Sequence, residues 1–206
     1  LQYREAIADF EKSLSINALQ PGVLTQMARA YVALQRPNEA LAALQKLALM
    51  APGNEGARRT WVANLLDLGR KEAAMEAALE LLKLNNGNAA VAREFGMLFS
   101  EYGHWPEASR LYKLAYGKDQ SADSAAMLVS SMLKEQPQRL ADAGVVIREV
   151  SDKTENHWPM LLARSRWQAQ QSDKVGARAS LTRALTLIGD KNLDQLRNWY
   201  QVVTEV

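Results

Sequence analysis

The sequence predicts an all-α protein built from stacked helical hairpins. The first observation is a period of 34 residues, which separates Ala40, Ala74 and Ala108 and is shared by several other apolar columns. The second is that apolar residues recur at spacings of three and four within each period, as on an amphipathic helix with one buried face. The third is that turn-forming segments rich in Gly, Pro and Asn separate the helical stretches. Since a single hairpin of this size cannot bury its apolar face alone, we expect consecutive hairpins to stack.

Composition limits the possible functions. The chain has 206 residues, 48% of them hydrophobic, and a formal net charge of +2, so we expect a folded protein. A nearly balanced charge argues against nucleic-acid binding, which needs Lys and Arg concentrated on one surface. The absence of cysteine excludes disulfides and thiolate chemistry but is compatible with an oxidising or a reducing compartment. No stretch reaches the roughly 20 apolar residues of a membrane-spanning helix, so we expect no membrane insertion by this segment.

The chain is expected to begin in the middle of a repeat. Residues 1–20 hold only the second helix of a hairpin, with Ala6, Phe10 and Ser13 at the expected positions, so the sequence looks like a piece of a longer protein. Residues 21–54 are predicted to form the first complete repeat. Its two apolar stripes are Leu24, Met27, Ala28 and Tyr31 in the first helix and Ala40, Leu44 and Leu47 in the second.

Two further complete repeats are predicted at residues 55–88 and 89–122. The first is the weaker, because Arg58 occupies a position that is usually apolar and Ala78 replaces a large side chain. The second repeat matches the pattern at the positions Phe95, Gly96, Phe99, Ala108, Tyr112 and Ala115. The hairpin turns are expected at "QRPN", "LGRK" and "YGHW", and the turns between repeats at "APGN", "NNGN" and "GKDQS".

The C-terminal part of the chain is predicted to contain degenerate repeats. Residues 123–157 keep the register only after one inserted residue in the "KEQPQR" turn, and residues 158–190 continue in that shifted frame, where Arg164 and Gln168 are expected to break the first helix. Residues 191–206 read as a final helix that either covers the end of the stack or starts another repeat.

The spacing of these residues resembles the tetratricopeptide repeat (TPR) family. The pattern of large, large, small and aromatic residues in the first helix, followed by Ala, a large residue, Ala or Leu, and Pro, covers most of the chain and ends at Pro52 in the first complete repeat. The resemblance implies a right-handed α-solenoid whose first helices line a concave groove. It also implies that repeat positions 2, 5, 9, 12 and 13 face this groove, and that the groove holds a protein or peptide partner.

These positions carry charges of both signs. Arg59 and Arg93 share position 5, and Arg29 and Arg166 share position 9, so guanidinium groups are expected along part of the groove. Asp67, Glu101 and Glu135 all fall at position 13, near helix C-termini, where an acid opposes the helix dipole by a few tenths of a kcal/mol. One interpretation is a groove suited to a charged partner segment. The alternative is a set of local ion pairs with bases such as Arg70, each worth roughly 0 to 1 kcal/mol.

No catalytic motif accompanies the repeats. The sequence lacks a glycine-rich phosphate loop, a zinc-protease motif, a nucleophile elbow and an acidic calcium loop, so we expect no enzymatic activity, no cofactor and no metal site. The two histidines occur in two His-Trp-Pro tripeptides, His104-Trp105-Pro106 and His157-Trp158-Pro159. They are not a multiple of the period apart, so we interpret them as two helix starts rather than a shared ligand site.

The predicted function is therefore a scaffold that binds a protein or peptide. The style of the repeats is similar to bacterial TPR proteins of envelope assembly or exopolysaccharide secretion, which would place the chain in the periplasm. A cytoplasmic adaptor or regulatory module is the alternative. A third possibility is self-association, within a larger enzyme or through apolar residues near one end such as Trp199 and Tyr200.

Overall fold

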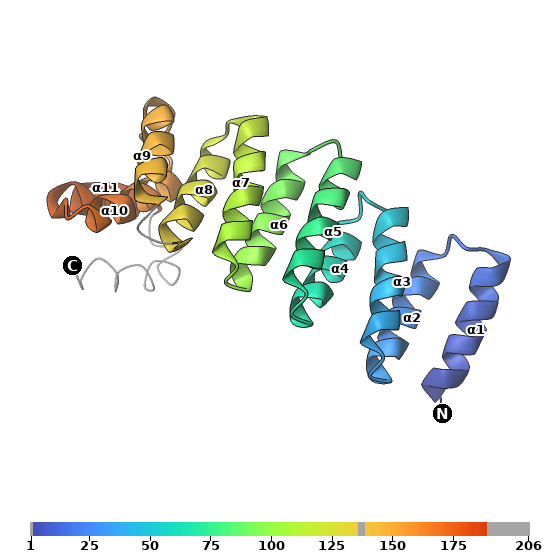
Figure 1. The fold of residues 1–206 in the computed structure, drawn as a ribbon. Helices are drawn as coiled ribbons and strands as arrows, with labels where there is room; N and C mark the ends of the chain where they lie inside the picture. The colour runs from blue at the N-terminus through green and yellow to red at the C-terminus, as the bar shows by residue number, and fades with distance from the viewer. Residues whose placement is uncertain (1, 136–138, 189–206) are drawn as a thin grey trace. The chain divides into compact units, whose positions relative to one another are not determined.

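A computed structural model describes residues 2–135 and 139–188, and all of its regular elements are helical. It confirms the predicted all-α fold of stacked helical hairpins (Figure 1). The chain divides into two compact units, Leu1–Gly87 and Asn88–Val206, and each is described by itself. The predicted helix at 191–206, with Trp199 and Tyr200, lies outside the described residues, as do residues 136–138 of the "KEQPQR" turn in which the inserted residue is expected.

The N-terminal unit contains five helices in the part of the chain that the structure describes. They are α1 (Gln2–Ile16), α2 (Pro21–Ala33), α3 (Pro37–Met50), α4 (Glu55–Asp67) and α5 (Lys71–Leu84). Each helix packs against the next one along the chain. The helices α2 and α3 form one hairpin and α4 and α5 the next, while α1 covers α2 (Figure 1).

The C-terminal unit continues the same arrangement within its described residues. Its helices are α6 (Ala89–Glu101), α7 (Trp105–Asp119), α8 (Ala122–Glu135), α9 (Leu140–Glu149), α10 (Trp158–Gln170) and α11 (Lys174–Ile188), with a 3₁₀ turn η2 (Ser151–Lys153) before α10. Three hairpins result, α6 with α7, α8 with α9 and α10 with α11, and the first helices α8 and α10 also contact each other.

Local chemistry explains where these helices start. Proline lies in the first turn of α2, α3, α7 and α10, where its missing N–H leaves no hydrogen bond unmade. Asn54 caps α4 by accepting a hydrogen bond from the Ala57 N–H at 3.0 Å, and Asn88 caps α6 by accepting one from the Ala90 N–H at 2.8 Å.

The three hairpin turns that follow α2, α4 and α6 share one backbone conformation. Gln35, Gly69 and Gly103 occupy the same position in successive repeats, and each has a positive φ, of 56°, 69° and 75° respectively. Glycine adopts this left-handed region without a steric penalty, whereas an L-residue with a side chain pays roughly 1 to 2 kcal/mol. Gln35 therefore holds a turn that the repeat geometry requires and that its own side chain disfavours.

The buried face of each hairpin is filled differently from repeat to repeat. Phe95 and Phe99 of α6 are completely buried, and Gly96 between them lets the ring of Tyr112 from α7 approach the helix backbone. In the preceding repeat, Val62 stands in place of Gly96 and Ala78 in place of Tyr112, and both are completely buried. A large residue on either helix is thus matched by a small residue on the other.

Two details of the sequence interpretation were wrong. The turn expected at "GKDQS" does not begin at Gly117: α7 continues to Asp119, and Gln120 takes the left-handed conformation at its end. Likewise, Arg164 and Gln168 do not interrupt α10, because Gln168 accepts a hydrogen bond from the Ser180 hydroxyl at 2.7 Å and so satisfies its polar group inside the hairpin. Among the described helices, none combines the length and the hydropathy needed to cross a bilayer.

Candidate functional site

The N-terminal unit contains three of the predicted groove residues. Arg29 lies on α2, is exposed, and makes no hydrogen bond or ion pair with any residue that the structure describes. Arg59 lies on α4 and is half-buried, and Asp67 is exposed as the last residue of α4. Of the predicted arginines, Arg29 is thus the one whose guanidinium is most accessible to a partner.

Arg93, in the C-terminal unit, is used within the fold. Its Nη1 atom donates to Asp119 at the end of α7 and, at 2.8 Å, to the Ser124 hydroxyl at the start of α8. The Ser124 hydroxyl also donates to Asp119 Oδ2 at 3.1 Å. This network links three consecutive helices, so Arg93 holds the α7–α8 connection in addition to any role toward a partner.

Burial and hydrogen bonds act in opposite directions on the pKa of Asp119. Burial raises the pKa of this carboxyl, but hydrogen bonds from the Ser121 backbone, from Ser124 and from Arg93 outweigh burial and hold the pKa below its usual value. The anionic form of Asp119 is therefore part of the folded structure at neutral pH.

The remaining predicted residues of the C-terminal unit differ in accessibility. Glu101 is exposed at the end of α6. Glu135 Oε2 accepts a hydrogen bond from Arg139 Nη1 at 3.1 Å, a local ion pair of the kind expected under the alternative interpretation. Arg166 on α10 is half-buried, and desolvation lowers its pKa to about 10. It stays charged at neutral pH, but much of its side chain is covered.

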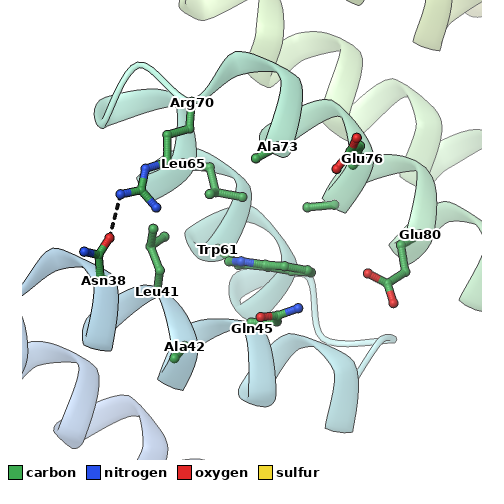
Figure 2. A pocket seen from close by; sticks show the side chains of 11 residues that line it. Asn38, Leu41, Ala42, Gln45, Trp61, Leu65, Arg70, Ala73, Glu76 and Glu80 are labelled. Carbon is green, nitrogen blue, oxygen red and sulfur yellow. Dashed lines mark hydrogen bonds between the residues drawn. The ribbon is translucent and has the colours of Figure 1, made fainter.

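The structure also contains a groove that the sequence analysis did not predict. It lies between the second helices α3 and α5, with α4 as its floor, and has a volume of about 360 Å³ (Figure 2). Its lining residues are Asn38, Leu41, Ala42, Gln45, Trp61, Leu65, Arg70, Ala73, Glu76, Ala77 and Glu80. We call this feature the α3–α5 groove. Its volume is within the range of roughly 300 to 1,000 Å³ that ligand pockets usually have.

Charges of opposite sign lie at different places along the α3–α5 groove. Arg70, directly before α5, donates from Nη2 to the side-chain oxygen of Asn38, and Figure 2 shows the two side chains together at one end. Glu76 and Glu80 lie farther along α5, away from Arg70 (Figure 2). Arg70, which the alternative interpretation pairs with a position-13 acid, thus bonds to the preceding repeat.

Sequence reasoning missed the α3–α5 groove because it considered only first-helix positions. The available signal was the small size of Ala42, Ala73 and Ala77 on the two second helices. Small side chains in both walls leave space that larger ones would fill, but the pattern shows only after the helices have been placed.

The two histidines begin helices, as the sequence interpretation expected. His104 directly precedes α7, and His157 directly precedes α10, where its Nδ1 atom accepts a hydrogen bond from the Met160 N–H at 3.3 Å. His157 Nε2 also contacts Asp123 Oδ1 at 2.9 Å. Within residues 2–135 and 139–188, no group of three or more His, Asp or Glu side chains is arranged to hold a metal ion.

Comparison with known proteins finds a family match in the sequence and similar solved structures. Residues 2–65 match the family described as tetratricopeptide repeat, whereas none of the curated proteins matches the sequence. A tetratricopeptide repeat protein from Parabacteroides merdae is similar in structure, with a TM-score of 0.51 at 16% identity over 98% of this chain and 78% of that one. YrrB, a TPR protein with an unusual peptide-binding site, gives 0.53 at 14% identity over 92% of this chain and 97% of its own. Yeast Tom70 gives 0.54 at 13% identity over 95% of this chain and 42% of its own.

Proposed function

We propose that this chain, whose residues 2–65 match the tetratricopeptide repeat family, is a non-catalytic module that binds an acidic segment of another protein through its first helices. The observation that carries the proposal is the exposed guanidinium of Arg29, which has no partner among the described residues. Arg59 on the next first helix is half-buried and adds a second positive charge in the same unit. The repeat register assigns both residues to the partner-facing surface.

Arginine is suited to this role. Its planar guanidinium can donate two parallel hydrogen bonds to one carboxylate, which adds geometric specificity to the charge attraction. The other predicted residues support the proposal less. Arg93 and Glu135 are paired within the fold, and the side chain of Arg166 is partly covered. The proposed site is therefore centred on Arg29 and Arg59 of the N-terminal unit, with Asp67 at its edge. Glu101, an exposed acid of the C-terminal unit, is not part of this site.

Selection from a displayed random peptide library tests this function. We expect the selected peptides to be enriched in Asp and Glu and to bind less tightly as salt rises. The double variant R29E/R59E should weaken their binding by at least about tenfold, since each charge-assisted hydrogen bond is worth roughly 1.5 to 3 kcal/mol. Far-ultraviolet circular dichroism should show unchanged helicity.

The matched control reverses two exposed arginines outside the proposed site. Arg4 lies on α1 and Arg110 on the second helix α7, and R4E/R110E changes the net charge by the same amount. If R4E/R110E weakens binding as much as R29E/R59E does, the attraction depends on net charge alone, and the proposed site is wrong.

The biological setting is a separate proposal that rests on the style of the repeats. We propose a role in bacterial envelope assembly or exopolysaccharide secretion, with a cytoplasmic adaptor as the alternative. Fractionation of the native cells distinguishes them, because recovery in the periplasmic fraction is expected and recovery in the cytosol would support the adaptor. Self-association is tested by light scattering over a range of concentrations, and a constant monomer mass would exclude it.

A further inference from the structure

We propose that the α3–α5 groove is a second binding site, which takes an extended peptide segment with one acidic and one basic side chain about three or four residues apart. This site lies on the second helices and does not use Arg29 or Arg59, so it goes beyond the function proposed above. Three features support the proposal: the shape of the groove, two carboxylates that have no partner among the described residues, and the arginine at the opposite end.

Small residues in both walls help to keep the groove open. Ala42 of α3 and Ala73 and Ala77 of α5 line it with methyl groups only. Trp61 and Leu65 of α4 close the floor and are themselves 5% and 6% exposed. An extended chain resting there would cover apolar surface, and the aliphatic stem of a Lys or Arg side chain can lie over such a floor with its charge in water.

One part of the groove attracts positive charge. Glu76 and Glu80 are exposed on the same face of α5, four residues apart, and neither makes an ion pair or a hydrogen bond with any residue in the described ranges. Like charges at this helical spacing destabilise a helix by about 0.2 to 0.5 kcal/mol. A basic side chain between the two carboxylates would remove this repulsion and form charge-assisted hydrogen bonds.

The other end attracts negative charge. Arg70 precedes the first residue of α5 and is oriented by its hydrogen bond to Asn38. Only part of the donor capacity of a guanidinium is used by this bond, because the group carries several N–H donors in one plane. The N-terminus of α5 adds a partial positive charge at the same place.

The distance between the two ends sets the spacing of the peptide charges. A helical rise of about 1.5 Å per residue places Glu76 about 9 Å and Glu80 about 15 Å from Arg70 along the α5 axis. An extended chain advances about 3.3 Å per residue. The acidic and basic residues of the bound segment should therefore be about three or four positions apart.

Synthetic octapeptides test the proposal directly. The probe carries one Asp and one Lys three or four positions apart on a background of Ala, Ser and Thr. Comparison peptides place the two charges adjacent to each other or replace Lys by norleucine. Binding is followed by fluorine NMR of protein labelled with 5-fluorotryptophan, in which the Trp61 signal is assigned from the W61F variant. We expect the correctly spaced peptide to bind at least about fivefold more tightly than either comparison peptide and to shift the Trp61 signal.

Variants of the protein locate the binding. A73L fills the groove and should abolish binding, while A33L makes the same change at an exposed position of α2 outside the groove lining and should leave it unchanged. E76Q/E80Q should reduce the preference for Lys over norleucine. R29E/R59E should bind the probe as the unaltered protein does, so failure of the first-helix site and failure of this site are distinguished.

Three results would overturn the proposal. The first is that no peptide binds up to its solubility limit, and the second is that A73L binds as well as A33L does. The third is a concentration-dependent dimer of the unaltered protein that A73L abolishes, because the groove would then hold a second copy of this chain rather than a partner peptide.

Discussion

Replacing Gly96 by alanine tests the close packing of α6 against Tyr112 of α7. A Cβ atom at Gly96 would lie 2.5 Å from Cε1 and 2.7 Å from Cδ1 of Tyr112, so the tyrosine ring has to move. Its hydroxyl is 3.3 Å from the Ser100 hydroxyl, and displacement of the ring would disturb that contact as well. Overpacking of a filled core costs about 1 to 3 kcal/mol, whereas alanine gains about 0.5 to 1 kcal/mol over glycine within a helix.

We therefore expect Gly96→Ala to lower the free energy of unfolding by about 1 to 2 kcal/mol. Urea denaturation followed by circular dichroism measures this change. The control is Gly117→Ala on α7, where an added Cβ meets no atom within 4 Å. This variant should be more stable by roughly 0.5 to 1 kcal/mol.

A double-mutant cycle isolates the contact itself. Residues Ala28 and Leu44 occupy the equivalent positions two repeats earlier and are both buried, so Gly96→Ala combined with Tyr112→Leu copies a pair that the chain already contains. We expect a coupling free energy of at least about 1 kcal/mol in favour of the combination. If Gly96→Ala alone leaves the free energy of unfolding unchanged or raises it, the inferred close approach of the Tyr112 ring to the backbone at Gly96 is wrong.

The remaining predictions concern a turn and the Arg93 network. Gln35→Gly should raise the free energy of unfolding by about 1 kcal/mol, because Gln35 has a φ of 56° in a turn where the next two repeats have glycine; no gain in a urea titration would contradict this. Arg93→Ala should cost about 1 to 2 kcal/mol through its lost bonds to Asp119 and Ser124, which thermal unfolding would detect. Since the folded pKa of Asp119 is lowered, its stabilisation is present above the unfolded pKa of about 3.9 and is lost as pH falls toward the folded value. The variant D119N should therefore lose less stability than the unaltered protein between pH 5 and pH 2, and parallel pH profiles would refute this assignment.

The hairpin fold was predictable because it depends on periodicity. The period of 34 residues and the apolar spacing report burial directly, and the structure confirms the all-α hairpin fold. Local backbone details were less accessible: Gln35 gives no sign of a left-handed conformation, and Gly117 suggested a helix end although α7 continues past it. Such details depend on what the neighbouring helices require, which a single sequence does not display.

The candidate site was predictable only in part. Repeat register identified Arg29 as a first-helix residue, and the structure finds it exposed. Register did not reveal that Arg93 bonds to Asp119, because that partner lies at the end of the second helix, 26 positions along the chain. The α3–α5 groove depends on side-chain volumes in two helices and on Trp61 beneath them. No single position of the repeat pattern contains that information.

The most direct test of the central claim is chemical-shift mapping by NMR with an acidic peptide selected on the unaltered protein. If the first helices bind the partner segment, the largest shifts will fall on α2 and α4 and will include the side-chain Nε–H signals of Arg29 and Arg59. Shifts that leave both arginine signals unchanged, with saturable binding to another surface, would contradict the proposed mode of recognition.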